Sequence, residues 1–432
     1  MQPRVEPIAA AQIDEVGQKS GLTDCFWVGT LSPTTFNILG PDAGATYWIS
    51  QYQLPAGARL QFRGVFPFAR HASFNTYDDK GQPLDRINDD LIEPESRNGV
   101  NPFRAGATRD GANRNYRIEV ASHELKAGSQ VSDASRASNT LYAPSSGNVQ
   151  IIYRVYVPDH GKDAKGGVPL PQPVMIRADG SKVEGEALCR DIVRKDGAVH
   201  KITVSADVQR EFYAMPGRSK FQPAQYEPKW DASFNFGLTA SRMLIGTAFE
   251  PMRDKQDHTR RGALYSTLDN TYMAMYVDNR IGQVLVLEGK APTTPRTQMG
   301  EKIMQAADLR YWSVCKYRSL ADSAVDACLY DEQVPQDRNG KFIIALSAPG
   351  DRPGNARPDC GVAWMPWGTG DGAGNPHGGM LLWRQMLPSA EFRPHSIFST
   401  TKLNEEQTVL GDYYPKPRYV SRAEFEKLGC SR

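Results

Sequence analysis

The chain has 432 residues, of which 40% are hydrophobic and 23% are charged, and its formal net charge is +2. This length is too great for one hydrophobic core and suits two domains of an ordinary globular protein. The basic residues are scattered rather than clustered, and no apolar run approaches the roughly 20 residues of a membrane span. We therefore expect neither a nucleic-acid partner nor a membrane span.

Residues 1–45 are expected to form an N-terminal arm with one short helical stretch near residues 8–18. The segment Met1–Pro7 shows no signal-peptide core. The chain is therefore either cytosolic or derived from a precursor whose signal was removed.

The first predicted module spans residues 46–173 and consists of short strands. Apolar and polar residues alternate in Leu60–Arg63 and again in Tyr116–Val120, as they do in half-buried strands. The acidic stretch from Asp85 to Glu95 offers oxygen ligands of the kind that Ca²⁺ prefers, but it lacks EF-hand spacing. We expect this stretch to be a solvated loop.

An insert at residues 174–260 breaks the strand pattern. The segment Ser181–Glu184 has the form of a capping box before a helical stretch that contains Cys189. A second short helix is predicted over residues 206–215.

The second predicted module spans residues 261–388 and repeats the first. Three sequence motifs, called the repeated phrases below, occur in both halves in the same order. They are Gly-x6-Gly-x2-Pro at 57–67 and 282–292, Arg-x2-Ser-x3-Tyr at 70–77 and 310–317, and aromatic-Arg-x3-Pro at 153–158 and 383–388. Three shared phrases in one order indicate an internal duplication. In the tail, residues 389–432, the capping box Ser421–Glu424 predicts a short closing helix.

The predicted fold is mainly β. It consists of two jelly-roll-like antiparallel β-sandwich domains from an internal duplication, with a few short helices in the insert and at the C-terminus. The 38 Gly and 30 Pro are spread along the chain, which is typical of many turns between short strands.

The repeated arginines are candidates for a functional site. Arg70 and Arg310 each enter a strand with aromatic content, and Arg154 and Arg384 each follow an aromatic residue. A buried arginine needs partners. Each of these residues forms either a salt bridge or backbone clamp that holds the sandwich, or an anion-binding fork in a pocket.

The six cysteines permit complete pairing. Cys315 and Cys328 bracket a polar loop just after a strand, which fits a hairpin-closing disulfide and favours a periplasmic or secreted location. No His/Cys cluster has zinc-site spacing, and no P-loop, His-Glu-x-x-His or Gly-x-Ser-x-Gly motif occurs. We therefore predict neither a metal site nor a cofactor.

Both halves resemble known bacterial domains. In the second half, Tyr272-x3-Tyr276, Gly282-x6-Gly289, Arg310–Val314 and Trp364-Met365-Pro366-Trp367 resemble the domain of unknown function DUF1214. In the first half, Tyr47-Trp48, Leu54–Gly57 and Arg70-x2-Ser73-Phe74-x2-Tyr77-Asp78 are similar to its usual partner, DUF1254. The resemblance implies two β-sandwich domains that are often exported and often oligomeric, so a homo-oligomer is expected. It implies no settled activity, and the insert and the cysteines depart from the family pattern.

The leading functional hypothesis is an extracytoplasmic protein that binds a sugar, a lipid or an aromatic acid in a pocket between its modules. Aromatic residues are dense near the repeated arginines, and an apolar pocket with an arginine at its base is a common plan for small ligands. The residues expected to contact the ligand are Arg310, Tyr311, Trp312, Arg70, Tyr77 and Arg384.

Two alternatives remain open. The first is a secreted glycan hydrolase in which paired carboxylates face each other across a cleft. Its candidate catalytic residues are Asp331, Glu332, Asp89 and Asp90. The second is a structural or assembly protein, which large exposed apolar faces and stable oligomers would favour.

Overall fold

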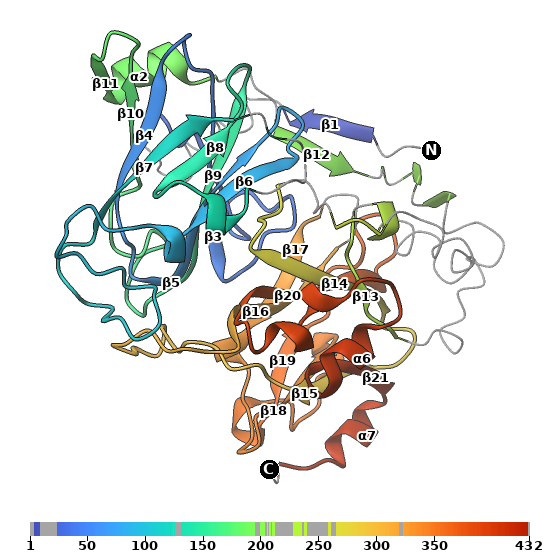
Figure 1. The fold of residues 1–432 in the computed structure, drawn as a ribbon. Helices are drawn as coiled ribbons and strands as arrows, with labels where there is room; N and C mark the ends of the chain where they lie inside the picture. Colours follow the sequence, from blue (N-terminus) through green and yellow to red (C-terminus); the bar gives the residue numbers. More distant parts are fainter. Residues whose placement is uncertain are drawn as a thin grey trace.

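Figure 1 shows the computed structural model of the chain. The structure describes residues 4–8, 24–123, 125, 131–194, 199–203, 205, 207–208, 210–211, 228–235, 237–239, 258–260, 265–318 and 323–430. The helices predicted near residues 8–18 and over residues 206–215 lie largely outside these ranges.

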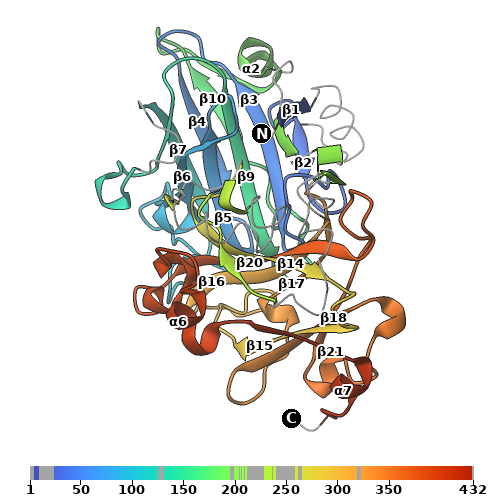
Figure 2. The same ribbon diagram turned by 90° about the vertical axis from the view of Figure 1, so that its right-hand side faces the viewer.

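Two β-sandwiches, one from each half of the chain, account for most of the fold (Figures 1 and 2). The inner sheet of the first sandwich has the order β2 (Gly29–Leu31), β3 (Ala45–Tyr52), β9 (Val149–Pro158), β5 (Ala69–Tyr77) and β6 (Pro83–Asn88). Its outer sheet has the order β11 (Lys182–Glu184), β10 (Gln172–Ile176), β4 (Arg59–Val65), β7 (Asn115–Ser122) and β8 (Thr140–Ala143).

The second sandwich is built in the same way. Its inner sheet has the order β13 (Asp231–Ala232), β14 (Asn270–Asp278), β20 (Gly378–Pro388), β16 (Leu309–Tyr317) and β17 (Val325–Tyr330). Its outer sheet has the order β19 (Ala363–Pro366), β18 (Lys341–Ser347), β15 (Val284–Lys290) and β21 (Lys416–Val420). A separate two-stranded sheet pairs β1 (Arg4–Ile8) with β12 (Val199–Thr203).

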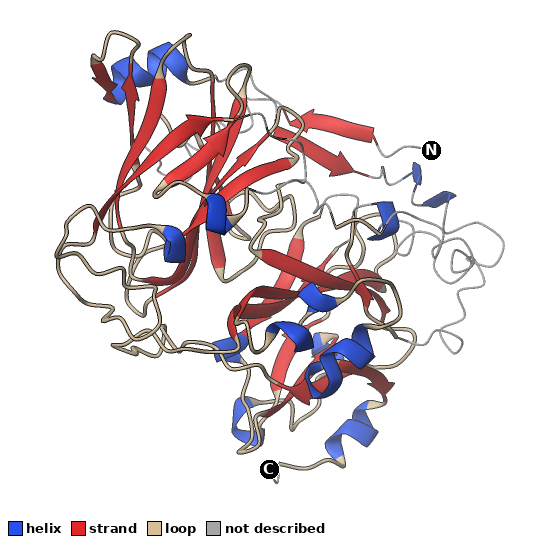
Figure 3. Ribbon diagram, viewed as in Figure 1, coloured by secondary structure: helices blue, strands red, loops and turns tan. Residues whose placement is uncertain are grey.

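Helices are few and short in the described ranges (Figure 3). The described α-helices include α2 (Gly185–Ile192), α6 (Glu406–Leu410) and α7 (Arg422–Glu426). The 3-10 turns are η1 (Asp89–Leu91), η2 (Asp133–Ser135), η5 (Asp331–Gln333), η6 (Pro349–Asp351), η7 (Pro358–Cys360), η8 (Arg393–His395), η9 (Ile397–Ser399) and η10 (Gly411–Tyr413). Among the described helices, none has the length and apolar character needed to cross a membrane.

The matching strand order of the two inner sheets confirms the internal duplication. The registers also agree. Arg154 on β9 lies between Tyr47 on β3 and Ser73 on β5, and Arg384 on β20 lies between Tyr272 on β14 and Ser313 on β16. Both copies carry a register irregularity at the same point of the next hairpin, just before the equivalent tyrosines of β5 and β16.

A backbone kink at the end of β9 and β20 is also duplicated. Val157 has φ 46° and Leu387 has φ 45°. The amide of Val157 donates to the carbonyl of Gly44 at 2.7 Å, and that of Leu387 donates to the carbonyl of Asp269 at 3.2 Å. A positive φ is rare for such residues. The shared kink therefore places Gly44 and Asp269 at equivalent positions in the two copies.

Each inner sheet is buried on both faces, and this creates the interface between the sandwiches. On β9, Ile151, Tyr153 and Val155 belong to the core of the first sandwich, whereas Ile152 and Tyr156 belong to a cluster that joins the two inner sheets. The same alternation occurs in the second inner sheet, where Trp312 faces the core of its own sandwich and Tyr311 faces the first sandwich. The four sheets therefore stack as outer, inner, inner and outer layers.

The sheets differ from the prediction in two respects. Each outer sheet is mixed rather than antiparallel, because β7 pairs with β8, and β18 with β19, in parallel. In addition, strands outside the predicted module ranges complete the sheets: β2 lies in the predicted N-terminal arm, β10 extends into the predicted insert, β11 and β13 lie within the insert, and β21 lies in the predicted tail. The repeated phrases do not reach these strands, so the phrases gave no sign of them.

The acidic stretch from Asp85 to Glu95 is not the solvated loop that we expected. Its first half forms the buried strand β6 and the turn η1. Both terminal nitrogens of Arg136 donate to the carboxylate of Asp85, at 2.8 and 2.7 Å. This neutralises a charge that would be costly to bury alone.

Of the two predicted capping boxes, one caps a helix in the structure and the other does not. Ser421 and Glu424 cap α7 as predicted. Around Ser181, by contrast, Lys182–Glu184 form β11 and the helix begins only at Gly185.

All six cysteines form disulfides, and the predicted pair Cys315–Cys328 is one of them. It joins β16 to β17. The other two pairs are Cys25–Cys189 and Cys360–Cys430.

Candidate functional site: the interface between the inner sheets

Arg70 and Arg310, the repeated arginines near the starts of β5 and β16, reach across the interface. Each forms an ion pair with acidic residues of the other sandwich. Arg70, in the first sandwich, is fully buried and forms ion pairs with Asp331 and Glu332 of the second. Arg310, in the second sandwich, pairs with Asp89 of the first at 3.0 Å and lies 3.9 Å from Asp90. Each arginine therefore binds the 3-10 turn of the other half. Such reciprocal contacts are expected of two copies related by an approximate two-fold axis.

The acids are also held by their own sandwich. Asp89 accepts the amide of Ala72 at 2.6 Å, and Asp331 accepts the amide of the equivalent Trp312 at 3.2 Å. Burial alone would raise the pKa of Asp89. The imidazole of His71, 2.9 Å away, and the guanidinium of Arg310 outweigh burial and lower that pKa below its ordinary value.

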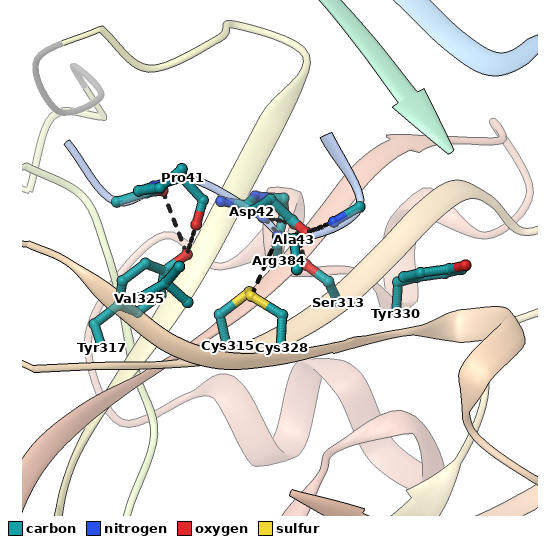
Figure 4. The surroundings of a disulfide bond; sticks show 12 residues. Pro41, Asp42, Ala43, Ser313, Cys315, Tyr317, Val325, Cys328, Tyr330 and Arg384 are labelled. Carbon is teal, nitrogen blue, oxygen red and sulfur yellow. Dashed lines mark hydrogen bonds and ion pairs between the residues drawn. A yellow bond between two sulfur atoms is a disulfide. The ribbon is translucent and has the colours of Figure 1, made fainter. Parts of the chain in front are cut away.

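Each half also contributes a loop that binds the other sandwich, and we call these the exchanged loops. The first of them, residues 37–44, belongs to the first half and binds the second sandwich (Figure 4). The carboxylate of Asp42 accepts hydrogen bonds from the hydroxyls of Tyr311 at 2.8 Å and Ser313 at 2.6 Å, and forms an ion pair with Arg384. The hydroxyl of Tyr317 donates to the carbonyl of Pro41 at 3.1 Å.

The same loop also lies against the Cys315–Cys328 disulfide, because the amide of Ala43 contacts the sulfur of Cys328 at 3.4 Å. Glycine at position 44 leaves room for the side chain of Tyr311. A Cβ atom there would lie 2.5 Å from the hydroxyl oxygen of Tyr311.

The second exchanged loop, residues 265–269, binds the first sandwich in the corresponding way. The hydroxyl of Tyr77 donates to the carbonyl of Ser266 at 3.1 Å, just as Tyr317 binds Pro41 in the other half. Asp269 lies 2.7 Å from the Nε atom of Arg86 and accepts a hydrogen bond from Asn88 at 2.9 Å. The interface is therefore held by two exchanged arginines and two exchanged loops.

A cavity of about 160 Å³ lies between the two inner sheets, beside the exchanged loops. Most of its lining is aliphatic or aromatic, and two arginines and several hydroxyl groups supply the polar part. Its described lining residues include Tyr47, Tyr156, Tyr272, Tyr317, Arg154, Arg384, Leu31, Ile152, Leu382, Met380, Ser266 and Thr267.

The two arginines that line the cavity, Arg384 and Arg154, differ in whether a carboxylate of the described ranges pairs with them. Arg384 pairs with Asp42, and its guanidinium lies 5.1 Å from the ring centre of Tyr272. Burial lowers the pKa of Arg384 to about 9, and the contact with Asp42 favours its charged form. Arg154 donates to the carbonyl of Tyr265 at 2.6 Å and lies over the ring of Tyr47. No carboxylate of the described ranges forms an ion pair with Arg154, and its Nη1 atom has no hydrogen-bond partner there.

Only one of the six residues predicted to contact a ligand lines this cavity, and that residue is Arg384. Arg70 and Arg310 are the interdomain clamps described above. The hydroxyl of Tyr311 binds Asp42, and Trp312 lies in the core of the second sandwich, stacked on Trp383 at 4.8 Å.

The remaining predicted residues hold the interface together. Tyr77 anchors the second exchanged loop. None of the four predicted catalytic acids lines the cavity. Of these acids, Asp89, Asp331 and Glu332 form ion pairs with arginines of the other half, and Asp90 lies near Arg310.

The sequence predicted Arg154 as a candidate anion-binding fork but not as one of the six expected ligand residues, and it gave Tyr156 and Ser266 no role in a pocket. A signal for Arg154 existed, because it occupies the same place in its repeated phrase as Arg384. The loop residue Ser266 lies in no repeated phrase, so the sequence carried no signal for it.

No family model matches the chain, and no curated protein matches it. Among solved structures, an uncharacterised protein from Burkholderia cenocepacia aligns with a TM-score of 0.47 and 12% identity, over 96% of this chain and 88% of that one. The VPA0106 protein from Vibrio parahaemolyticus aligns with a TM-score of 0.39 and 12% identity, over 96% of this chain and 97% of that one. The resemblance to DUF1254 and DUF1214 stays a prediction.

Replacing Arg310 by Met should strongly destabilise the protein, because it leaves the buried carboxylate of Asp89 without its partner from the other half. We expect the free energy of unfolding, measured by chemical denaturation, to fall by about 3–5 kcal/mol. The control is Arg104→Met, which removes an exposed pair with Glu93 and should cost at most about 1 kcal/mol. Equal, small losses in both variants would show that Arg310 is not a clamp.

The contribution of Asp89 should depend on pH. Its pKa is lower in the folded than in the unfolded protein, so the stability it provides is fully present above the unfolded value and is lost as pH falls through the folded value. The stability gap between the wild type and Asp89→Asn should therefore be largest near neutral pH and should shrink below about pH 4. Denaturation curves across this range measure this gap, with Asp79→Asn at an exposed position as control. A gap that grows on acidification contradicts the assignment.

Proposed function

We propose that this protein is an extracytoplasmic small-molecule-binding protein whose ligand occupies the cavity between the two inner sheets. The observation that supports the proposal is a partly enclosed, mostly apolar cavity into which the two halves each contribute an arginine and tyrosines. Pockets with apolar walls and a few convergent polar groups are the usual form of small-molecule sites.

The size and lining of the cavity restrict which of the expected ligands can bind there. A cavity of about 150 Å³ lined by aliphatic and aromatic residues is sufficient to hold benzene. The observed 160 Å³ therefore suits a ligand of about one ring. A sugar would present hydroxyl groups to Leu31, Ile152 and Leu382, which have no hydrogen-bonding groups in their side chains. Of the ligands expected from the sequence, a compact aromatic molecule fits best.

The disulfides support the proposed location. Three disulfides formed by all six cysteines are typical of proteins that fold in an oxidising compartment, and they are rare in the cytosol. A periplasmic or secreted location is therefore part of the proposal.

The alternative functions receive less support from the described residues. A glycan hydrolase needs two carboxyl groups that reach a substrate. Three of the candidate acids are occupied by ion pairs that cross the interface. An assembly protein would expose large apolar faces, but the large hydrophobic side chains exposed in the described ranges are limited to Val100, Met299, Ile303 and Leu428.

Filling the cavity should abolish binding. Leu382→Trp adds an aromatic ring to the cavity wall, so the variant should lose affinity for compact aromatic probes while it remains folded. The measurement is saturation-transfer NMR and calorimetric titration with benzyl alcohol, benzamide and benzoate. The matched control is Leu428→Trp, which makes the same change at an exposed position. If no probe binds the wild type, or if all bind Leu382→Trp equally well, the proposed function is wrong.

A further inference from the structure

We propose that the ligand of this cavity is a small monocarboxylate with an aromatic or branched apolar body, and that its carboxylate binds Arg154. This inference rests on the function proposed above and adds the chemical class of the ligand and the residue that recognises its charge. Its basis is a difference between the two copies of the duplicated structure.

Position 42 in the first exchanged loop corresponds to position 267 in the second. Both residues lie three positions before an inner strand and accept its first backbone hydrogen bond: Ala45 donates to Asp42 at 3.1 Å, and Asn270 donates to Thr267 at 3.3 Å. Their side chains also act alike. The Oδ1 atom of Asp42 accepts the amide two residues on at 2.8 Å, and the Oγ1 atom of Thr267 does the same at 3.2 Å.

This correspondence explains why, among the residues that the structure describes, only one of the two cavity arginines has a carboxylate partner. In one copy, Asp42 supplies a carboxylate to Arg384. In the other copy the equivalent residue is Thr267, which is uncharged, and Arg154 has no acidic partner in the described ranges. The acid of the second loop, Asp269, is bound instead to Arg86 and Asn88. Within the described ranges, no residue therefore supplies to Arg154 the carboxylate that Asp42 supplies to Arg384.

The surroundings of Arg154 favour an external anion. Only 2% of Arg154 is exposed, and its guanidinium lies 5.4 and 5.7 Å from the ring centres of Tyr47 and Tyr77. Ring faces attract a cation but do not neutralise it. Burial raises the pKa of Tyr77 to about 12, so its phenol is not a counter-ion at neutral pH.

Two unpartnered donors are available for the ligand. In the described ranges the Nη1 atom of Arg154 and the hydroxyl of Ser266 have no hydrogen-bond partner, and both residues line the cavity. A carboxylate accepts two or more such bonds, and arginine binds it with a fork of donors. One positive charge that no carboxylate of the described ranges compensates matches a monoanion, and the apolar walls suit the rest of the ligand.

The decisive comparison uses benzoate and benzamide, which have nearly the same shape and differ in charge. Calorimetric titration of the wild type at neutral pH should give an affinity for benzoate at least about tenfold higher than for benzamide, as expected for a charge-assisted hydrogen bond. This comparison needs no variant, so it cannot fail through misfolding.

Two variants test the recognising residue. Thr267→Asp copies the arrangement of the first loop and should neutralise Arg154, so benzoate affinity should fall about tenfold or more while benzamide affinity is retained. The matched control Thr267→Asn adds no charge and should keep the preference for benzoate. Arg154→Met should lose the preference in the same way as Thr267→Asp.

The outcomes separate this inference from the proposed function. If benzamide binds the cavity as tightly as benzoate, or if Thr267→Asp keeps the preference for benzoate, the assignment of Arg154 is wrong and cavity binding stands. If neither compound nor benzyl alcohol binds the wild type, both proposals are wrong.

Discussion

The structure depends on a reciprocal exchange of charged groups between two copies of one β-sandwich. Arg70 reaches the acidic turn of the second copy, and Arg310 reaches the equivalent turn of the first. A buried guanidinium or carboxylate is costly unless it is paired. Because each copy holds the partners that the other requires, neither inner sheet can be separated from the other without exposing unpaired buried charge.

Hydrophobic burial acts together with this exchange. Each inner sheet has an apolar face toward its own outer sheet and an aromatic face toward the other copy. Side chains alternate along a strand, so a strand that is buried on both faces shows no regular polar positions. This explains why the strands of the inner sheets contain arginine, histidine and tyrosine at positions that would face solvent in an ordinary sandwich. The cavity lies in this second, shared core.

Much of the fold was predictable from the sequence because the duplication left three phrases in the same order. The phrases marked strands of both inner and outer sheets, and the hairpin around Cys315 and Cys328 indicated their disulfide. The strands β13 and β21 were not predictable in this way, because they carry none of the phrases. The sequence also predicted that the repeated arginines are candidates for a functional site. A salt bridge that holds the sandwiches together was one of the two roles considered for them.

The site was only partly predictable, for a physical reason. Whether an arginine serves as a clamp or faces a cavity depends on partners distant in the sequence, as in the pairing of Arg70 with Asp331 across 261 positions. The difference between Arg384 and Arg154 depends on Asp42 and Thr267, in loops outside the repeated phrases. Such pairs become visible only when the two copies are compared in three dimensions.

The central claim is that the two sandwiches form one cooperative unit, because they share a buried interface with exchanged charges. Differential scanning calorimetry of the intact protein tests it most directly. We predict one unfolding transition whose calorimetric enthalpy equals its van't Hoff enthalpy. Two separate transitions, with one sandwich remaining folded while the other unfolds, would contradict the account.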